Sequence, residues 1–205
     1  MKYMVEKVKK QKIAWGITGA GDKIQEIIET MKAFKMESQD TLEIEVFVSK
    51  AADTMLKFYR LDEELKKSFS KVSIEINANA PFLAGMVQSR RYEFLLIFPA
   101  SSNTVAKIVN GIGDTLLTNS AIMSLKAFVP VWIMPVDYKE SVLYTKLPNG
   151  KEMKLRVRKE EAEQVRRLEQ TEDVRVFESP QKVHEALSEC LITLRKAGTV
   201  KNLLD

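Results

Sequence analysis

The run Phe94-Leu-Leu-Ile-Phe-Pro-Ala100 is the feature that most constrains the fold of this chain, because it is apolar at every position. A strand exposed on one face alternates apolar and polar residues, whereas a strand covered on both faces is apolar throughout. Residues 129–136, VPVWIMPV, have the same character. We therefore expect two central strands of a parallel sheet that has helices on both faces.

Three further runs predict strands at residues 12–18, 41–49 and 71–77. Apolar residues at helical spacing separate the predicted strands. They predict helices over 22–34, 50–67, 81–91 and 103–126, the last of them broken near Gly111 and Gly113. Five strands that alternate with helices are typical of an α/β fold with an open parallel sheet, Rossmann-like and flavodoxin-like in its arrangement.

Local signals also predict where two helices begin and where one ends. Asp22, with Gln25 three residues later, has the spacing of a capping box at the start of the first helix. Ser179 and Pro180 suit the first positions of the last helix, and Gly198 suits its end.

The sequence changes character after Tyr138. Two strand-like runs flank Pro148-Asn149-Gly150, and Asn-Gly strongly favours a tight hairpin turn. A charged helix over 159–170, a strand over 173–177 and the last helix follow. We expect residues 1–137 to form a ligand-binding domain, and residues 138–205 to form a hairpin and helix extension packed on the same domain.

Composition excludes several classes of function. The chain has 32 basic and 28 acidic residues and a net charge of +4, which is a mixed surface and not a nucleic-acid footprint. No apolar run approaches the ~18 residues that span a membrane. His184 and Cys190 are the only residues of their types, so an internal disulfide and a cysteine-ligated metal site are excluded. We expect a cytoplasmic protein without a bound metal.

Small and uncharged residues follow three of the predicted strands. Thr18-Gly19-Ala20-Gly21 follows the first, Ser49 the second, and Ser101-Ser102-Asn103-Thr104 the fourth. Ligands of parallel sheets bind at the carboxyl ends of the strands, where helix N-termini attract phosphate. A NAD site would place a carboxylate after the second strand, but Ser49 and Lys50 stand there. This pattern favours a phosphate or a mononucleotide, while the glycine turn taken alone favours a purely structural connection.

The segments GITGAGDKI, VFVSKAA and PASSNTVAKIVNGIGDTLLTN resemble the flavoprotein family that includes cysteine-peptide decarboxylases, phosphopantothenoylcysteine decarboxylase and flavin prenyltransferase. The shared pattern falls on Pro99, Ala100, Ser101, Asn103, Thr104, Ala106, Lys107, Gly111 and Asp114. The resemblance covers roughly residues 13–136. It implies an FMN-binding fold that assembles as trimers or multiples of trimers, with the flavin at a subunit boundary.

The resemblance also implies which residues surround the flavin. The loop after the first strand and Ser49 would contact the phosphate and the ribityl chain, and the segment after the fourth strand would meet the flavin itself. Lys107 would offer charge to the phosphate or remain solvated, and Asp114 would brace the loop. The implied FMN site comprises Thr18, Gly19, Ala20, Gly21, Ser49, Lys50, Pro99, Ala100, Ser101, Ser102, Asn103, Thr104 and Lys107.

Departures from the family pattern bear on the reaction. The decarboxylases carry a histidine after the third strand and a Pro-Ala-Met-Asn stretch after the fifth, but this chain has no histidine in the first region and Met134-Pro135-Val136-Asp137 in the second. It is more similar to the archaeal branch of archaeoflavoproteins and dihydromethanopterin reductases. That similarity implies an FMN-dependent oxidoreductase or electron carrier, which takes electrons from a ferredoxin-like or other redox donor and passes them to a small-molecule acceptor such as a dihydropterin.

Three alternatives remain open at this point. One is a flavin-dependent decarboxylase, another is a flavin prenyltransferase with the same flavin site, and the third is a non-catalytic subunit. The basic residues Arg156, Arg158 and Lys159 suit either the docking of an acidic donor or the solvated side of a helix.

Overall fold

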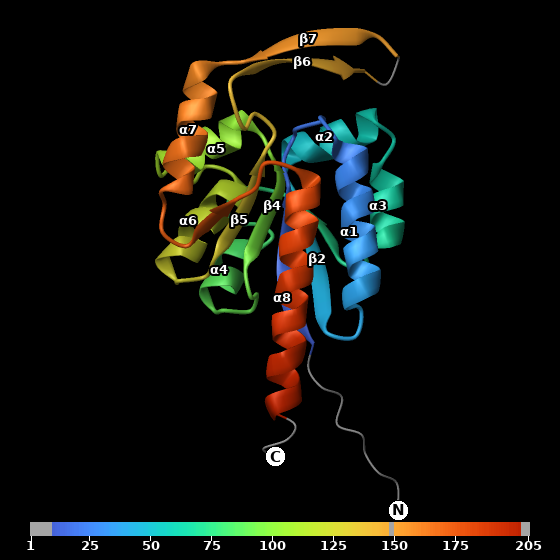
Figure 1. Cartoon of the computed structure of the whole chain (residues 1–205), viewed down its shortest axis with the longest axis vertical. Coiled ribbons are helices and arrows are strands. Elements are labelled where there is room, and N and C mark those ends of the chain that lie inside the picture. The colour runs from blue at the N-terminus through green and yellow to red at the C-terminus, as the bar shows by residue number, and fades with distance from the viewer. Residues whose placement is uncertain (1–9, 148–149, 202–205) are drawn as a thin grey trace, which may run out of the picture.

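Six parallel strands form the central sheet of the protein, as the computed structural model shows for residues 10–147 and 150–201 (Figure 1). The strand order is β3-β2-β1-β4-β5-β8, which confirms the open parallel α/β fold. The strands of this sheet are β1 (Gln11–Ile17), β2 (Leu42–Val48), β3 (Val72–Ile74), β4 (Leu95–Ala100), β5 (Val131–Pro135) and β8 (Val174–Val176). All six residues of β4 are buried, as its apolar run predicts.

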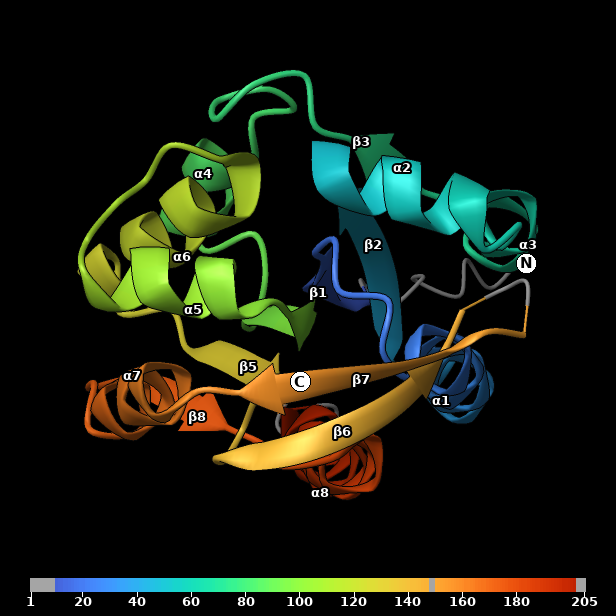
Figure 2. The same cartoon turned by 90° about the horizontal axis from the view of Figure 1, so that it is seen from above.

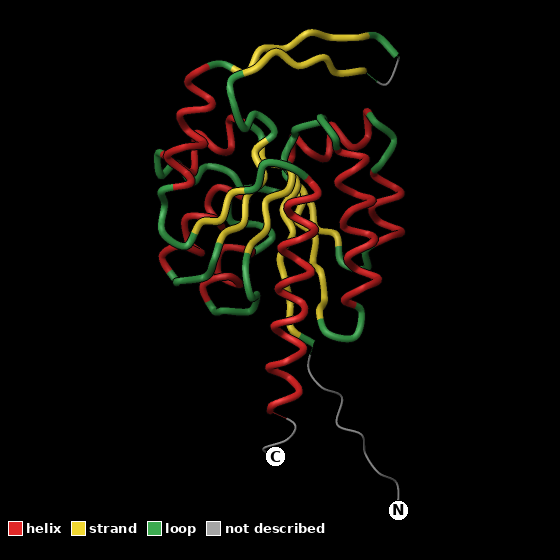
Figure 3. Tube along the Cα trace, in the orientation of Figure 1, coloured by secondary structure: helices red, strands yellow, loops and turns green. Residues whose placement is uncertain are grey.

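Helices cover both faces of the sheet (Figures 2 and 3). They are α1 (Ile24–Ser38), α2 (Lys50–Phe58), α3 (Asp62–Ser68), α4 (Leu83–Gln88), α5 (Ser102–Val109), α6 (Leu116–Lys126), α7 (Lys159–Glu169) and α8 (Pro180–Lys201). Buried residues of α1, α2, α3 and α8 form one core cluster with one face of the sheet. Buried residues of α4, α5, α6 and α7 form a second cluster with the other face.

The sheet holds one strand more than the five that the sequence predicts for its parallel core. The predicted strand over 173–177 becomes β8, which pairs parallel with β5 from Val131↔Val174 to Ile133↔Val176. Its three residues gave no sign of this partner, because strand pairing depends on contacts between residues far apart in the sequence. The last helix, α8, then packs beside α1 on one face.

Large aromatic side chains fill the first core cluster. Trp15 is fully buried, its indole Nε1 donates a hydrogen bond to the Phe98 carbonyl oxygen at 2.6 Å, and its ring meets Phe69 edge-on at 5.1 Å between centroids. Trp132 stacks on Phe94 at 4.1 Å. These residues are packing residues of the core, as their strand positions predict.

The predicted capping box of the first helix is wrong. Lys23, with φ 55°, is the N-cap of α1, and no side chain caps this helix. A left-handed residue at the cap position displaces Asp22 into the preceding turn, where its carboxylate makes no hydrogen bond to the backbone of α1. At the start of α8, by contrast, Ser179 Oγ accepts a hydrogen bond from the Lys182 backbone N–H at 3.3 Å, which confirms the predicted cap.

The predicted end of α8 at Gly198 is also wrong, because the helix continues to Lys201. A glycine allows the left-handed conformation that ends many helices but does not impose it.

A separate two-stranded sheet crosses the carboxyl ends of the strands (Figures 1 and 2). It consists of β6 (Ser141–Lys146) and β7 (Glu152–Val157), paired antiparallel. The hairpin prediction is confirmed by this pairing, although Pro148 and Asn149 lie outside the described residues. The hairpin lies over the carboxyl edge of the main sheet.

A buried carboxylate organises the opposite, amino end of the sheet. Glu45 on β2 is 6% exposed and accepts hydrogen bonds from Lys12 at 2.8 Å, Lys71 at 3.1 Å, Arg91 at 3.1 Å and the Tyr92 hydroxyl at 2.6 Å. Burial alone would raise the pKa of Glu45, but these donors outweigh it and lower the pKa to about 2. The carboxylate is therefore charged throughout the physiological range.

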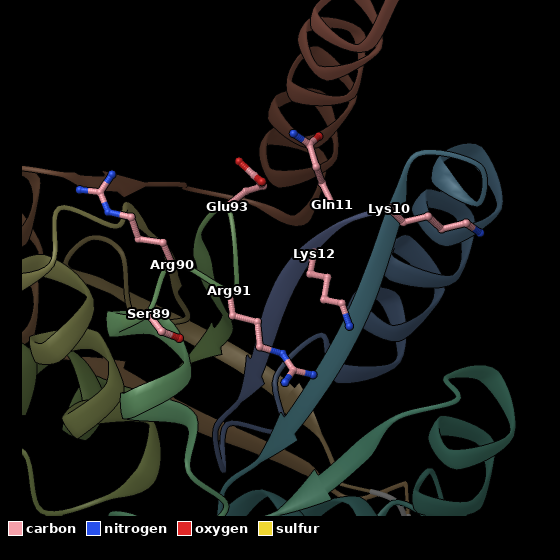
Figure 4. Close-up of a pocket in the computed structure, with 7 residues that line it drawn as sticks. All are labelled: Lys10, Gln11, Lys12, Ser89, Arg90, Arg91 and Glu93. Carbon is pink, nitrogen blue, oxygen red and sulfur yellow. The ribbon is translucent and has the colours of Figure 1, made fainter. Parts of the chain in front are cut away.

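A hollow of about 610 Å³ beside this cluster is lined by several basic residues (Figure 4). Figure 4 shows Lys12 and Arg91 pointing to one side, while Lys10 and Arg90 point away from them in opposite directions. Each of the four already has a partner, since Lys10 donates to the Gln39 carbonyl and Arg90 to the Ala127 carbonyl. The basic groups do not converge on a common anion.

Within the described part of the chain, we find no helix that combines the length and the apolar character needed to cross a bilayer.

We predict that Glu45→Gln lowers the free energy of unfolding at pH 7 by about 3 kcal/mol, because it removes the charge that four donors stabilise in the fold. A lowered folded-state pKa stabilises the fold above the ordinary glutamate pKa. The difference from wild type should therefore shrink as the pH falls below about 4.5 towards 2. Urea denaturation between pH 7 and pH 3 measures both effects.

Glu29→Gln is the matched control, since Glu29 pairs with Lys32 on the solvent-exposed side of α1. It should change stability far less. Equal destabilisation by the two substitutions at pH 7 would contradict the role of Glu45.

Candidate functional site

The carboxyl ends of β1, β2 and β4 are tied together by short hydrogen bonds. Thr18 Oγ1 donates to the Pro99 carbonyl oxygen and accepts from the Ser101 backbone N–H, both at 2.9 Å. Ser49 N–H donates to the Ile17 carbonyl oxygen at 3.0 Å. The structure thus brings the three predicted strand-end segments to one place, as expected of a parallel sheet.

Two helices begin in this place, and their first turns leave backbone donors available. Ser49 caps α2 by accepting from Ala52 N–H at 3.0 Å, and Ser101 caps α5 by accepting from Thr104 N–H at 3.4 Å. Among the described residues, the N–H groups of Ala51, Ser102 and Asn103 have no hydrogen-bond partner. Such free donors at a helix N-terminus bind anions or polar ligand atoms.

A first cavity of about 470 Å³ opens beside these helix starts, and we call it the strand-end cavity. It is lined by Thr18, Gly19, Ser49, Lys50, Ala51, Glu75, Asn77, Ala78, Ser101, Asn103, Thr104, Asp114, Thr115 and Leu117. Polar and uncharged side chains make up much of this wall. It can bind a ligand rich in hydroxyl groups or phosphate oxygens.

A second cavity of about 340 Å³ lies between the strand ends and the β6–β7 hairpin, and we call it the hairpin cavity. Its lining residues are Ala20, Gly21, Asp22, Tyr59, Ser101, Ser102, Asn103, Val136, Asp137, Leu143, Thr145, Met153 and Leu155. Leu143 pairs with Leu155, and Thr145 with Met153, so all four side chains lie on one face of the hairpin. This wall is more apolar and suits a flat ring.

Ser101 and Asn103 line both cavities. A ligand that extends from one cavity into the other would therefore contact these two residues. Their position at the start of α5 follows from the abrupt change from buried strand to polar helix in the sequence.

Ten of the thirteen predicted site residues line at least one cavity. They are Thr18, Gly19, Ala20, Gly21, Ser49, Lys50, Ser101, Ser102, Asn103 and Thr104. The other three do not: Pro99 and Ala100 are buried in β4, and Lys107 forms an ion pair with Asp114 at 2.9 Å.

The glycines of the first loop allow a close approach between this loop and α2. A Cβ atom on Gly19 would lie 2.7 Å from the Ala51 Cβ, and one on Gly21 would lie 2.9 Å from the Tyr59 ring. The absence of a side chain at Gly19 lets the loop approach the start of α2 at Ala51, and Gly21 lies against Tyr59 at the end of the same helix.

Sequence reasoning missed Glu75, which follows β3 in the strand-end cavity. Its carboxylate accepts hydrogen bonds from Lys50 N–H at 2.9 Å and from Leu116 N–H at 2.8 Å, so it joins the N-termini of α2 and α6. In the segment SIEIN this residue looks like an ordinary outward-facing strand residue.

Sequence reasoning also left Asp137 without a role, although it follows β5 in the wall of the hairpin cavity. The Ser102 hydroxyl donates a hydrogen bond to its Oδ2. Burial raises the pKa of Asp137, the Ser102 hydrogen bond opposes this, and the nearby carboxylates of Glu161 and Asp22 raise the pKa further. Of the described residues that line these two cavities, Asp137 alone has a pKa that clearly departs from its ordinary value.

Tyr138, Tyr144 and His184 line neither cavity. The Tyr138 hydroxyl donates to Glu169 at 2.7 Å, which raises the pKa of Tyr138 to about 12. Tyr144 is 69% exposed on the outer face of the hairpin. His184 pairs with Glu37 of α1 at 3.2 Å.

The family model named Flavoprotein matches residues 2–199. The chain is 42% identical over 176 residues to an uncharacterized protein of Methanocaldococcus jannaschii, which covers 86% of this chain and 94% of that protein. It is 32% identical to the dihydromethanopterin reductase (acceptor) of the same organism, over 85% of this chain and 94% of the reductase.

Among solved structures, DmrB of Burkholderia xenovorans in complex with FMN, described as a cubic protein cage for redox transfer, is 32% identical. It superimposes with a TM-score of 0.77 over 92% of this chain and 99% of DmrB. The match of the family model to nearly the whole chain, on a sheet whose ends carry the polar segments described above, shows that the chain belongs to the flavoprotein family.

Proposed function

We propose that this protein is an FMN-dependent oxidoreductase that passes electrons from a redox donor to a dihydropterin. The observation that carries the proposal is the pair of cavities that meet at Ser101 and Asn103, one lined by many polar residues and the other more apolar. FMN has the same division, with a phosphate and ribityl chain at one end and a flat ring at the other.

The residues at the strand ends fit FMN. Free N–H groups of Ala51, Ser102 and Asn103 and the hydroxyls of Thr18 and Ser49 would hold its polar part. The apolar side chains of the hairpin would cover a flat ring. Bound FMN would supply the ability to accept and release electrons, while the protein supplies position, polarity and exclusion of water.

The names of two relatives and the lining of the hairpin cavity support a dihydropterin as the acceptor. Two relatives with the name dihydromethanopterin reductase (acceptor) are 32% and 36% identical to this chain, the second over 65% of it. A pterin is a flat heterocycle, and the hairpin cavity offers apolar side chains with a few polar ones. No histidine lines either cavity, which favours electron transfer over the histidine-assisted decarboxylation that the family pattern also allows.

The donor is proposed to be a ferredoxin-like protein or another reductant, which would dock on the outer side of the hairpin. Lys154 and Arg156 project from that face together with the exposed Tyr144. Of the other two predicted docking residues, Arg158 pairs with Glu161 at 2.9 Å and Lys159 with Glu163 at 3.6 Å. Arg156 makes no ion pair within the described part of the chain, and this favours it as the contact.

We also propose that the protein works as a homo-oligomer, a trimer or a multiple of trimers. The cage formed by DmrB supports assembly of this kind.

Replacing Asn103 by Ala should weaken FMN binding about fivefold, since a side-chain hydrogen bond contributes ~1 kcal/mol. Lys126→Ala, on the exposed last turn of α6, is the control and should leave binding unchanged. Fluorescence titration of the purified apoprotein with FMN gives both dissociation constants. Equal constants for the two variants would exclude Asn103 from the site.

A colourless protein whose melting temperature does not respond to FMN would identify a non-catalytic subunit and refute the proposed function. Carbon dioxide release from a cysteine peptide, or prenylation of FMN by a prenyl phosphate, would instead identify the lyase or prenyltransferase alternative.

Electron delivery by an acidic ferredoxin should slow as the salt concentration rises, because exposed charges are screened beyond ~8 Å at physiological ionic strength. Arg156→Gln should lower the rate at low salt and flatten its salt dependence, while Lys67→Gln on α3 should do neither. Stopped-flow reduction of bound FMN measures these rates. Reduction at a rate independent of salt would show that the donor does not dock through these charges.

A further inference from the structure

Asp137 occupies an unusual position for a carboxylate. It lies in the wall of the hairpin cavity, directly after β5, and is only partly exposed. Its single hydrogen-bond partner among the described residues is the hydroxyl of Ser102, the first residue of α5. It forms no ion pair with any described lysine or arginine, whereas Glu45 at the other end of the sheet is held by three cations.

Two other carboxylates act on Asp137. Asp22 faces it from the loop after β1, and Glu161 acts on it from the first turn of α7. Tyr59 and the four hairpin residues also line this cavity, and none of its described lining residues is a lysine, arginine or histidine. Partial burial and these two carboxylates raise the pKa of Asp137, so it keeps its proton at a higher pH than an ordinary aspartate.

Reduction of a dihydropterin requires a proton as well as electrons. Its C=N bond gains one hydride equivalent at carbon and one proton at nitrogen, and becomes a CH–NH single bond. Reduced FMN, when bound, would supply the hydride equivalent. The proton must come from an acidic group of the cavity or from water, and a positioned acid speeds such a step by ~10²–10⁴-fold.

We infer that Asp137 is the general acid that protonates the acceptor in the hairpin cavity, with Ser102 as the residue that positions its carboxyl group. The inference rests on the function proposed above. Asp137 gives its proton to the acceptor nitrogen and becomes a carboxylate, which then takes a proton from solvent. Ser102 suits both states, because a hydroxyl donates to the carboxylate and accepts from the acid.

The test uses the FMN-loaded protein, reduced beforehand with dithionite and mixed with an acceptor in a stopped-flow instrument. With dihydromethanopterin, Asp137→Asn should reoxidise at least ~100-fold more slowly than wild type, because the proton donor is lost. With ferricyanide, which takes electrons without a proton, it should reoxidise as fast as wild type. Glu140→Gln, an exposed carboxylate three residues away, is the control and should match wild type with both acceptors. Asp137→Glu keeps an acid and should recover part of the rate.

The pH dependence separates an acid from a merely structural residue. The wild-type rate with dihydromethanopterin should fall as the pH rises through the pKa of Asp137, and Asp137→Asn should lose this decline. Ser102→Ala should move the decline to higher pH, because the Ser102 hydrogen bond stabilises the carboxylate and opposes the raised pKa.

The outcomes separate the two proposals. If wild-type protein binds FMN but does not reduce dihydromethanopterin, the proposed acceptor is wrong, and the role of Asp137 fails with it. If wild type reduces it and Asp137→Asn is equally fast, only the role of Asp137 fails. Slow reoxidation of Asp137→Asn by both acceptors would also overturn the inference, since it would indicate a general change in the flavin site.

Discussion

The candidate site depends on backbone N–H groups at the carboxyl edge of the sheet, for which the described part of the fold provides no hydrogen-bond partner. Parallel strands that lead into helices place helix N-termini at one edge, and the first turn of a helix has no internal partner for its N–H groups. In α2 and α5 the caps Ser49 and Ser101 satisfy one N–H each, and Glu75 satisfies that of Lys50. Among the described residues of these two helix starts, the N–H groups of Ala51, Ser102 and Asn103 remain without a partner. A ligand bound at this edge would accept hydrogen bonds from these free N–H groups.

Two buried carboxylates illustrate how differently this protein stabilises negative charge. Glu45 lies among cations and a tyrosine hydroxyl, so its charge is held by side chains. Glu75 accepts from two backbone N–H groups at helix starts, an environment that favours anions through aligned peptide dipoles. Glu45 stabilises the amino end of the sheet, and Glu75 forms part of the wall of the strand-end cavity at the carboxyl end.

Much of the fold could be predicted from the sequence, because it is encoded in local patterns. Period-two and period-3.6 spacing identified the strands and helices, and the change from buried strand to polar helix at Ala100 identified the segment at the centre of the site. The features that could not be predicted depend on contacts between segments that lie far apart in the sequence. The residues of Val174–Val176 and their neighbours in sequence do not indicate that this strand pairs with β5. The residues next to Leu143 and Leu155 in sequence likewise do not indicate that these two side chains line a cavity. The same holds for Asp137, whose properties come from neighbours on three other segments.

The hairpin supplies its cavity wall from one continuous stretch, Ser141 to Val157, whereas the opposite wall is assembled from the ends of several strands. Substitutions within this stretch can alter the shape of the roof without touching any residue that the sheet needs for its own packing. A change in the apolar side chains of the hairpin would therefore alter the space over the strand ends and leave the strand ends themselves unchanged.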